Sequence, residues 1–492
     1  MSVSVSRSAL NLLKAYLGTG LLAVPFAVSC AGLWLGMVFI GVLTFLSNHT
    51  MKLLVRMALH THRTRGEGSL LHRTDGDSSA DTTLQSLVYE DLGEAACGQC
   101  GRSLASWAKL LTNVGIVVGY MIFVGDTFLS MIQVARYPAP RNSTDAVLDP
   151  VVLSGSGGGS EGMRFNLLLL GLVPLCGGLG MLKTMKKLSF VSILGNISII
   201  VAIIVVMYSS SAYVVKHGPA PNLVSANPGL LPEFFGIALF SFALHGVVLE
   251  IILPMEKVEE RAYSVMDGVA FSVGIIYCAF GGLGYVAFGD SVQASILDNM
   301  PEHTPAERTV KVGTCFAMGA CIALSLPLFN FAIFRAIEDA LGWASESISP
   351  GQAVQNRPGD VAYSLIESST HGGEGLRVPH LVPGRSSYNT QRTSSCYKRT
   401  RVPLLRVFIV CCLVFVAMLL GKLFGDIIGF VGAFTMSTVA FIFPAYYFIR
   451  IMWNEQTTTL WDKFLAVSIF VGGFGAMIIS TFMAVKKVAH DV

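Results

Sequence analysis

Two long apolar stretches of this chain are interrupted near their middle by residues that do not favour a helix. The first covers residues 9–28 and is broken at 18–20, and the second covers 233–255 and is broken between 241 and 250. Every backbone N–H and C=O inside a bilayer needs a partner, so such breaks occur only where protein surrounds them or where they line a cavity. Matching interruptions in two halves of a chain are typical of a transporter's binding site. The pattern therefore predicts a carrier of a small polar solute.

The composition indicates an integral membrane protein. Hydrophobic residues make up 53% of the 492 residues and charged residues 13%, and the mean hydropathy is +0.62. A soluble domain is about one quarter charged. The net charge of +3 is small, and no basic block interleaved with aromatic residues indicates nucleic-acid binding. The sequence also has no metal-spaced cluster, nucleophile elbow or phosphate loop, so we expect neither an enzyme nor a cofactor.

Crossing a hydrocarbon core of roughly 30 Å takes about 20 helical residues. By this measure we expect an all-α, polytopic protein with eleven transmembrane helices. Their approximate ranges are 8–28, 32–56, 104–134, 164–183, 188–214, 232–254, 265–288, 308–338, 403–422, 424–450 and 460–485. The boundary between the ninth and tenth, at Gly421-Lys422, decides on which side of the membrane the chain ends.

The distribution of Lys and Arg predicts the orientation, because positive residues are retained on the cytosolic side. Most of the 34 Lys and Arg fall on cytosolic segments if the N-terminus is cytosolic, and eleven spans then place the C-terminus outside the cytosol. The loop 135–162 is then extracytosolic, and its sequon predicts glycosylation of Asn142.

Two segments lose the apolar pattern, 60–83 and 343–400. They are rich in Ser, Thr, Gly, Pro, Arg and Asp, and cannot bury enough surface to offset the entropy of ordering. We expect flexible cytosolic loops, the second of which could dock a cytosolic partner.

Short motifs follow one another along nearly the whole chain. They are Leu12-Leu13-Lys14 with Gly18-Thr19-Gly20-Leu21-Leu22 and Pro25, Tyr89-Glu90-Asp91-Leu92-Gly93, Phe240-Ser241-Phe242, Gly284-Tyr285 with Phe288-Gly289, Gln293-Ala294-Ser295-Ile296, and Pro327-Leu328 leading to Arg335 and Glu338. In this order they resemble the amino acid/auxin permease family, and most closely its proton-assisted and vacuolar amino acid transporter branch.

This resemblance implies a fold of the LeuT type, in which five helices are repeated in inverted orientation. The first repeat would be 8–214 and the second 232–450, with an extra helix at 460–485, all within one membrane transport domain over 1–492. The unwound parts of helices 1 and 6 would then meet at mid-membrane and bind an amino acid.

The first break has chemistry that suits a zwitterion. A helix that restarts after Gly18, Thr19 and Gly20 exposes free N–H groups at its start, around Gly20 and Leu21, and these favour a carboxylate. Carbonyl groups released at the end of the preceding half can accept hydrogen bonds from an ammonium. The alternative is that the glycines only permit close helix packing.

Helices 3, 6 and 8 would determine specificity. We expect Tyr120 and Phe123 on the third helix, Phe240, Ser241 and His245 on the sixth, and Asn330 on the eighth to shape the pocket. A pocket of Gly, Ser and Phe favours small neutral amino acids.

Three residues are candidates for proton coupling: Glu250, His245 and Asp126. Relatives in the proton-assisted branch usually carry an acidic residue where this chain has Ala243, and Glu250 follows within an apolar run. An ionised carboxylate there is costly, so we expect desolvation to favour its protonated form. The alternative is that Glu250 lies near the cytosolic helix end, where it caps the helix or pairs with Lys or Arg, and that His245 is a hydrogen-bonded packing residue.

Other readings remain open at this stage. Transport could be uncoupled exchange or facilitated diffusion, or the protein could be a transporter-like amino acid sensor. Ser325 could also join carbonyl groups of helix 1 around a sodium ion. The membrane could be vacuolar or lysosomal, another acidic endomembrane, or the plasma membrane.

Overall fold

The computed structural model describes most of the chain. The described residues are 3–18, 20–70, 84, 87–136, 160–180, 188–242, 244–341, 387–421 and 424–491. Thr19, Asn142 and Ala243 lie outside them, so the predictions made for these three residues stay predictions.

Within the described residues the regular secondary structure is helical, apart from one isolated bridge between Val3 and Met255. The α-helices are α1 (Val5–Tyr16), α2 (Gly20–Ala31), α3 (Leu33–Leu70), α5 (Tyr89–Arg136), α6 (Ser160–Gly180), α7 (Leu188–His217), α8 (Leu231–Ser241), α9 (Val248–Ile252), α10 (Val258–Phe288), α11 (Pro305–Ala340), α13 (Ser387–Leu420), α14 (Phe424–Val431), α15 (Phe443–Met452) and α16 (Leu460–Asp491). Two short 3-10 helices, η2 (Pro228–Leu230) and η3 (Gly289–Ser291), and two π-helical turns, η5 (Gly432–Met436) and η6 (Thr438–Ile442), complete the set.

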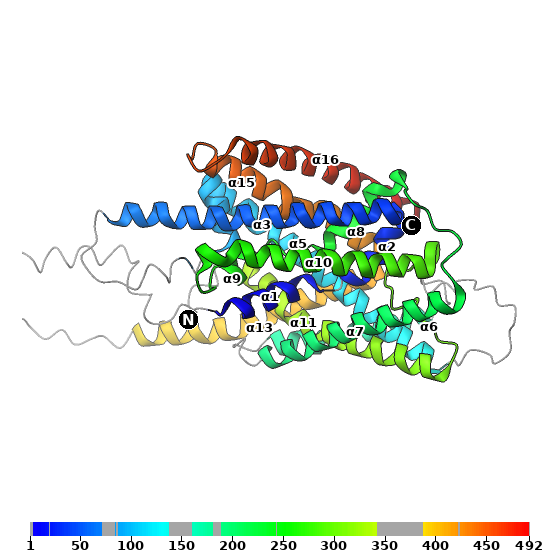
Figure 1. The fold of residues 1–492 in the computed structure, drawn as a ribbon. Coiled ribbons are helices and arrows are strands. Elements are labelled where there is room, and N and C mark those ends of the chain that lie inside the picture. Colours follow the sequence, from blue (N-terminus) through cyan, green and yellow to red (C-terminus); the bar gives the residue numbers. More distant parts are fainter. Residues whose placement is uncertain are drawn as a thin grey trace, which may run out of the picture.

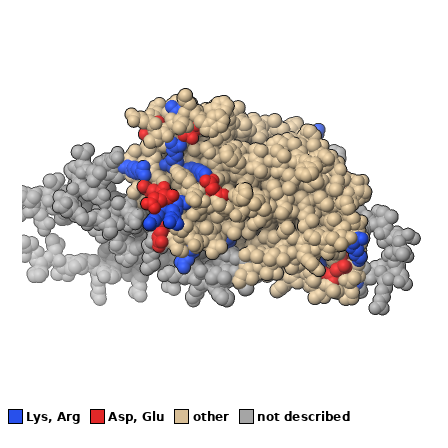
Figure 2. Space-filling model, in the orientation of Figure 1, with Lys and Arg blue, Asp and Glu red and all other residues tan. Residues whose placement is uncertain are grey.

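The described helices include 8 that are long and apolar enough to cross a membrane, and the bent pair α1–α2 is a ninth candidate. Two shorter apolar helices, Met163–Cys176 and Pro228–Ser241, lie where the fourth and sixth spans were expected. On the face drawn in Figure 2, acidic and basic residues gather toward the ends of the molecule and leave a broad uncharged band between them. The chain is therefore an integral, multi-pass membrane protein, while the count of eleven stays a prediction.

Both expected breaks are present. The axes of α1 and α2 differ in direction by 53° across the first break. At the second break, α8 ends at Ser241 and α9 begins at Val248. Figure 1 shows α1 and α9 toward the end where the chain begins, and α2 and α8 toward the opposite end. The two broken spans therefore run in opposite directions and are interrupted near the middle of the molecule.

The first residues of the chain join the two broken spans at one end. The Val3 N–H donates to the Pro254 carbonyl at 2.8 Å, and the Glu256 N–H donates to the Val3 carbonyl at 2.9 Å. These two hydrogen bonds connect the start of α1 to the residues that follow α9.

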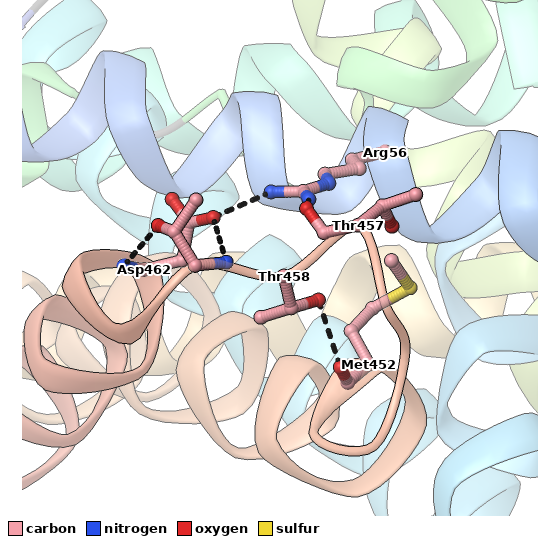
Figure 3. Close-up of polar contacts among 6 residues, drawn as sticks. Arg56, Met452, Thr457, Thr458 and Asp462 are labelled. Atoms are coloured by element: carbon pink, nitrogen blue, oxygen red, sulfur yellow. Dashed lines mark hydrogen bonds and ion pairs between the residues drawn. The ribbon is translucent and has the colours of Figure 1, made fainter.

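Arg56 of α3 fixes the connection between α15 and α16 at the same end (Figure 3). Its guanidinium lies 3.1 Å from the Asp462 carboxylate and donates to the Thr457 carbonyl at 2.5 Å. Thr458 donates to the Met452 carbonyl at 2.9 Å, which closes the turn. The latter part of α3 and the residues between α15 and α16 therefore lie together, as the expected topology requires.

The chain ends away from where it begins. Helix α13 ends at Leu420 and α14 begins at Phe424, so the expected boundary near Gly421 separates two helices. In Figure 1 the C-terminus lies at the end of the bundle opposite to the N-terminus. Which end faces the cytosol stays a prediction.

Two helices extend into segments that were expected to be loops. Helix α3 continues to Leu70 and α13 begins at Ser387, so both helices reach into the segments 60–83 and 343–400, whose role as flexible cytosolic loops stays a prediction. A helix satisfies its own backbone hydrogen bonds, and polar side chains remain hydrated on it beyond the apolar band. Loss of the apolar pattern therefore does not end a helix.

Helix α8 crosses the α14–η5 segment at glycine residues. A Cβ atom at Gly236 would overlap the carbonyl group of Gly429, and one at Gly432 would overlap that of Gly236. The two backbones touch, as small residues permit between membrane helices. The π-helical turns follow directly, and such turns are frequent at functional sites.

Replacing Gly432 with alanine should lower the free energy of unfolding by about 1–3 kcal/mol, because the added methyl group has no space beside the Gly236 backbone. Thermal unfolding of the purified protein in detergent measures this change. Gly472→Ala is the matched control, since a Cβ at Gly472 of α16 meets no atom within 4 Å. Equal unfolding temperatures for the two variants would contradict the tight crossing.

Candidate functional site

The two breaks touch each other. The Ser241 hydroxyl, at the end of α8, donates to the Gly20 carbonyl at 2.7 Å. A Cβ atom at Gly20 would lie 2.6 Å from the Ser241 Cα, which is too close for any side chain. Glycine at position 20 therefore permits direct contact between the start of α2 and the end of α8.

A tyrosine that sequence reasoning missed binds both breaks. The hydroxyl of Tyr277, on α10, lies 2.7 Å from the Tyr16 carbonyl and 2.8 Å from the Ser241 carbonyl. The side chain is completely buried, and its ring lies 5.3 Å from that of Phe242. The signal in the sequence is a phenol within a long apolar span, but an apolar span alone does not indicate which groups the hydroxyl contacts.

Glycines on α10 allow this approach. A Cβ at Gly281 would lie 2.7 Å from the Val24 side chain, and one at Gly284 would lie 2.7 Å from that of Pro25. Because Gly281 and Gly284 follow Tyr277 at intervals of four and three residues, all three lie on one face of α10. That face packs on α2.

The first break has the turn that was expected. The Gly18 N–H donates to the Tyr16 carbonyl at 2.8 Å, and the Leu21 N–H donates to the Gly18 carbonyl at 3.3 Å. A Cβ at Gly18 would lie 3.2 Å from the Tyr120 hydroxyl, so Tyr120 of α5 lies beside this break. The structure thus brings Gly18, Gly20, Tyr120 and Ser241 together.

The remaining pocket candidates lie on α5, α8 and α11. The Tyr120 ring contacts Phe329 at 5.3 Å, and Asn330 follows Phe329. Asn330 is completely buried, yet neither of its amide atoms has a hydrogen-bond partner. Phe240 is buried next to Ser241, while Phe123 packs against Phe424 of α14 at 5.9 Å. An unpartnered buried amide such as that of Asn330 is costly, and polar ligands supply such partners.

His245 connects the second break to α3. It is 1% exposed, and its Nε2 lies 2.9 Å from the Thr50 hydroxyl and 3.2 Å from the Ser47 carbonyl. The side chain is therefore held by α3.

The expected burial of Glu250 was wrong. Its side chain is 50% exposed and lies 3.3 Å from Lys109 of α5, which also lies 3.3 Å from Glu90. Helix α9 ends at Ile252, so Glu250 is close to the end of the span and reaches a lysine. This is the pairing that the alternative describes, and a role of Glu250 in proton coupling stays a prediction.

Asp126 belongs to a polar group between α5 and the residues before α11. Its carboxyl group interacts electrostatically with Asp298. The Ser130 hydroxyl donates to the Asp298 carboxylate at 2.9 Å. Lys311 donates to the Asp298 carbonyl at 3.2 Å and to Glu302 at 3.1 Å. Burial raises the pKa of Asp298, although the Ser130 hydrogen bond and Lys311 oppose this change. Asp298 was not a candidate, because it lies outside the apolar spans.

Ser325, the residue considered for a sodium site, donates to the Cys321 carbonyl at 2.9 Å within α11. This is the usual hydrogen bond of a serine inside a helix.

Comparison with known proteins agrees with this architecture. The family model described as transmembrane amino acid transporter protein matches residues 1–486. Amino acid transporter AVT3C of Arabidopsis thaliana is 28% identical over 334 residues, which cover 67% of this chain and 68% of the relative. Amino acid transporter ANT1 of the same organism is 22% identical over 484 residues, covering 97% of this chain and 91% of the relative.

Among solved structures, the crystal structure of MhsT in complex with L-phenylalanine aligns with 98% of this chain and 99% of its own, at a TM-score of 0.47 and 12% identity. The matched family and the two relatives are transporters, so the expectation that the chain is not an enzyme is confirmed. Because the family model covers almost the whole chain, the protein belongs to the amino acid/auxin permease family of transmembrane amino acid transporters.

Proposed function

We propose that the protein is a secondary active transporter that carries small neutral amino acids together with protons by alternating access. The observation that carries this proposal is the contact between the two breaks, in which Ser241 binds the Gly20 carbonyl and Tyr277 binds both spans. The N–H groups at the start of α2 suit a carboxylate. The carbonyl groups of Tyr16 and Ser241 suit an ammonium.

The breaks are closed on each other in the structure. With Gly20 against the Ser241 backbone, an amino acid can enter only when α2 and α8 move apart. Helices α1 and α9 lie toward one end of the molecule, and α2 and α8 lie toward the other. Separation of one of these pairs therefore opens the site toward one end only. This is the geometry that alternating access needs.

The residues beside the breaks support a small, uncharged side chain in the substrate. Tyr120, Phe240 and Ser241 add aromatic surface and a hydroxyl but no charge. The unpartnered amide of Asn330 offers one further polar contact. Thr19, Leu21, Phe123 and His245 remain candidates for the same pocket.

Of the three candidates for proton coupling, Asp126 is best supported. It lies close to a second carboxyl group, Asp298, and like charges favour uptake of a proton by one member of such a pair. Glu250 is half exposed and paired with Lys109. The pairing of Glu250 with Lys109 also fits the alternative, uncoupled exchange, which requires that neither Asp126 nor His245 carries a proton.

We place the protein in an acidic endomembrane, vacuolar or lysosomal, with its N-terminus in the cytosol. The Asp126 group then lies toward the acidic side, since it is near the residues between α10 and α11. Glycosylation of Asn142 and a cytosolic partner for residues 343–400 belong to the same proposal.

Gly20→Ala should reduce amino acid uptake roughly tenfold or more, because a methyl group at this position prevents closure against Ser241. Uptake of labelled alanine, glycine and proline into liposomes measures the effect. Gly41→Ala is the matched control, because a Cβ at Gly41 of α3 meets no atom within 4 Å. Normal uptake by Gly20→Ala would show that the breaks do not close during transport.

Asp126→Asn should abolish the stimulation of uptake by an inward proton gradient, because the amide cannot take up a proton. Glu250→Gln should keep this stimulation. The measurement compares initial uptake rates with and without the gradient for both variants and the wild type.

Loss of stimulation in Glu250→Gln alone would assign coupling to Glu250. A wild-type uptake rate that does not depend on the gradient would indicate uncoupled exchange. Binding of amino acids without uptake would indicate a sensor.

A further inference from the structure

The Tyr277 hydroxyl lies between two acceptors but has a single hydrogen. The carbonyl oxygens of Tyr16 and Ser241 are 2.7 and 2.8 Å from it. A tyrosine hydroxyl donates one hydrogen bond, so it satisfies one of these carbonyl groups at a time. All three groups are buried, and a buried carbonyl group without a hydrogen-bond partner costs free energy. The free energy of the protein therefore depends on which carbonyl accepts the hydrogen bond from Tyr277.

The two carbonyl groups do not depend on Tyr277 equally. The Tyr16 carbonyl already accepts a hydrogen bond from the Gly18 N–H at 2.8 Å. Among the hydrogen bonds of the described residues, the one from Tyr277 is the one that reaches the Ser241 carbonyl. When the site is empty, the hydrogen bond from Tyr277 therefore stabilises the Ser241 carbonyl more than it stabilises the Tyr16 carbonyl.

We propose that Tyr277 is a positioning residue that transfers its hydroxyl hydrogen bond from the Ser241 carbonyl to the Tyr16 carbonyl when the amino group of a substrate binds to Ser241. This inference rests on the proposed function, because it assigns an amino group to the second break. The substrate then supplies the hydrogen bond that Tyr277 withdraws. The Tyr277 hydroxyl then donates to the Tyr16 carbonyl at the end of α1. Binding of substrate at the second break therefore changes the hydrogen bonding of the first break.

Three variants separate this role from a purely structural one. Tyr277→Phe removes the hydrogen. Replacement of Tyr277 by 4-aminophenylalanine, introduced through a suppressor tRNA, places two hydrogens at the same position. Tyr285→Phe is the matched control, since Tyr285 is equally buried on the same helix and its hydroxyl accepts from the Val224 N–H at 3.0 Å, remote from both breaks.

The two Tyr277 variants should change the KM in opposite directions. In Tyr277→Phe the Ser241 carbonyl has no donor until substrate arrives, so the KM for alanine should fall about tenfold, the factor that one unpaired buried carbonyl is worth. The maximal rate should fall as well, because the spans are no longer connected. With 4-aminophenylalanine both carbonyls stay occupied and compete with the substrate, so the KM should rise about tenfold. Tyr285→Phe should leave the KM unchanged.

The experiment measures concentration-dependent uptake of labelled alanine, glycine and proline in liposomes, with each variant checked for a single peak in size-exclusion chromatography. A KM that is unchanged, or that moves in the same direction in both Tyr277 variants, would overturn the inference while leaving the transporter assignment intact. If Tyr277→Phe fails to fold, the 4-aminophenylalanine variant decides alone, and an unchanged or lowered KM there overturns the inference. No uptake by the wild-type protein would instead overturn the proposed function, and the role of Tyr277 with it.

Discussion

The need to pair every backbone polar group inside the bilayer determines how this molecule is built. Most spans meet it with continuous helices, but α1–α2 and α8–α9 leave N–H and C=O groups without helical partners. Ser241 and Tyr277 supply partners for the carbonyl groups of Gly20, Tyr16 and Ser241 itself. The two interruptions are therefore stabilised by lying together.

Charged groups are placed where water or an opposite charge is available. Lys109 pairs with Glu90 and Glu250 near one end of the bundle. Lys487, near the end of α16, pairs with Glu233 of α8 and lies 3.2 Å from Asp426 of α14. These pairs join broken and unbroken helices at both ends of the molecule.

The sequence was sufficient for the features that depend on local chemistry. Glycine and polar residues inside apolar spans predicted the breaks at 18–20 and after Ser241, because no continuous membrane helix favours them. The position of Glu250 was wrong, since neighbouring apolar residues do not reveal that α9 stops two residues later beside Lys109. Tyr277 and Asp298 were missed for a related reason: their partners come from other helices, and only the packing of α10 on α2 and of Ser130 on Asp298 creates the contacts.

The two hydrogen bonds of Val3 have a mechanical consequence. Because Val3 holds both Pro254 and Glu256, α1 cannot tilt outward without pulling α9 in the same direction. We therefore expect these halves of the two broken spans to move together, so that a displacement of Val3 reaches both of them.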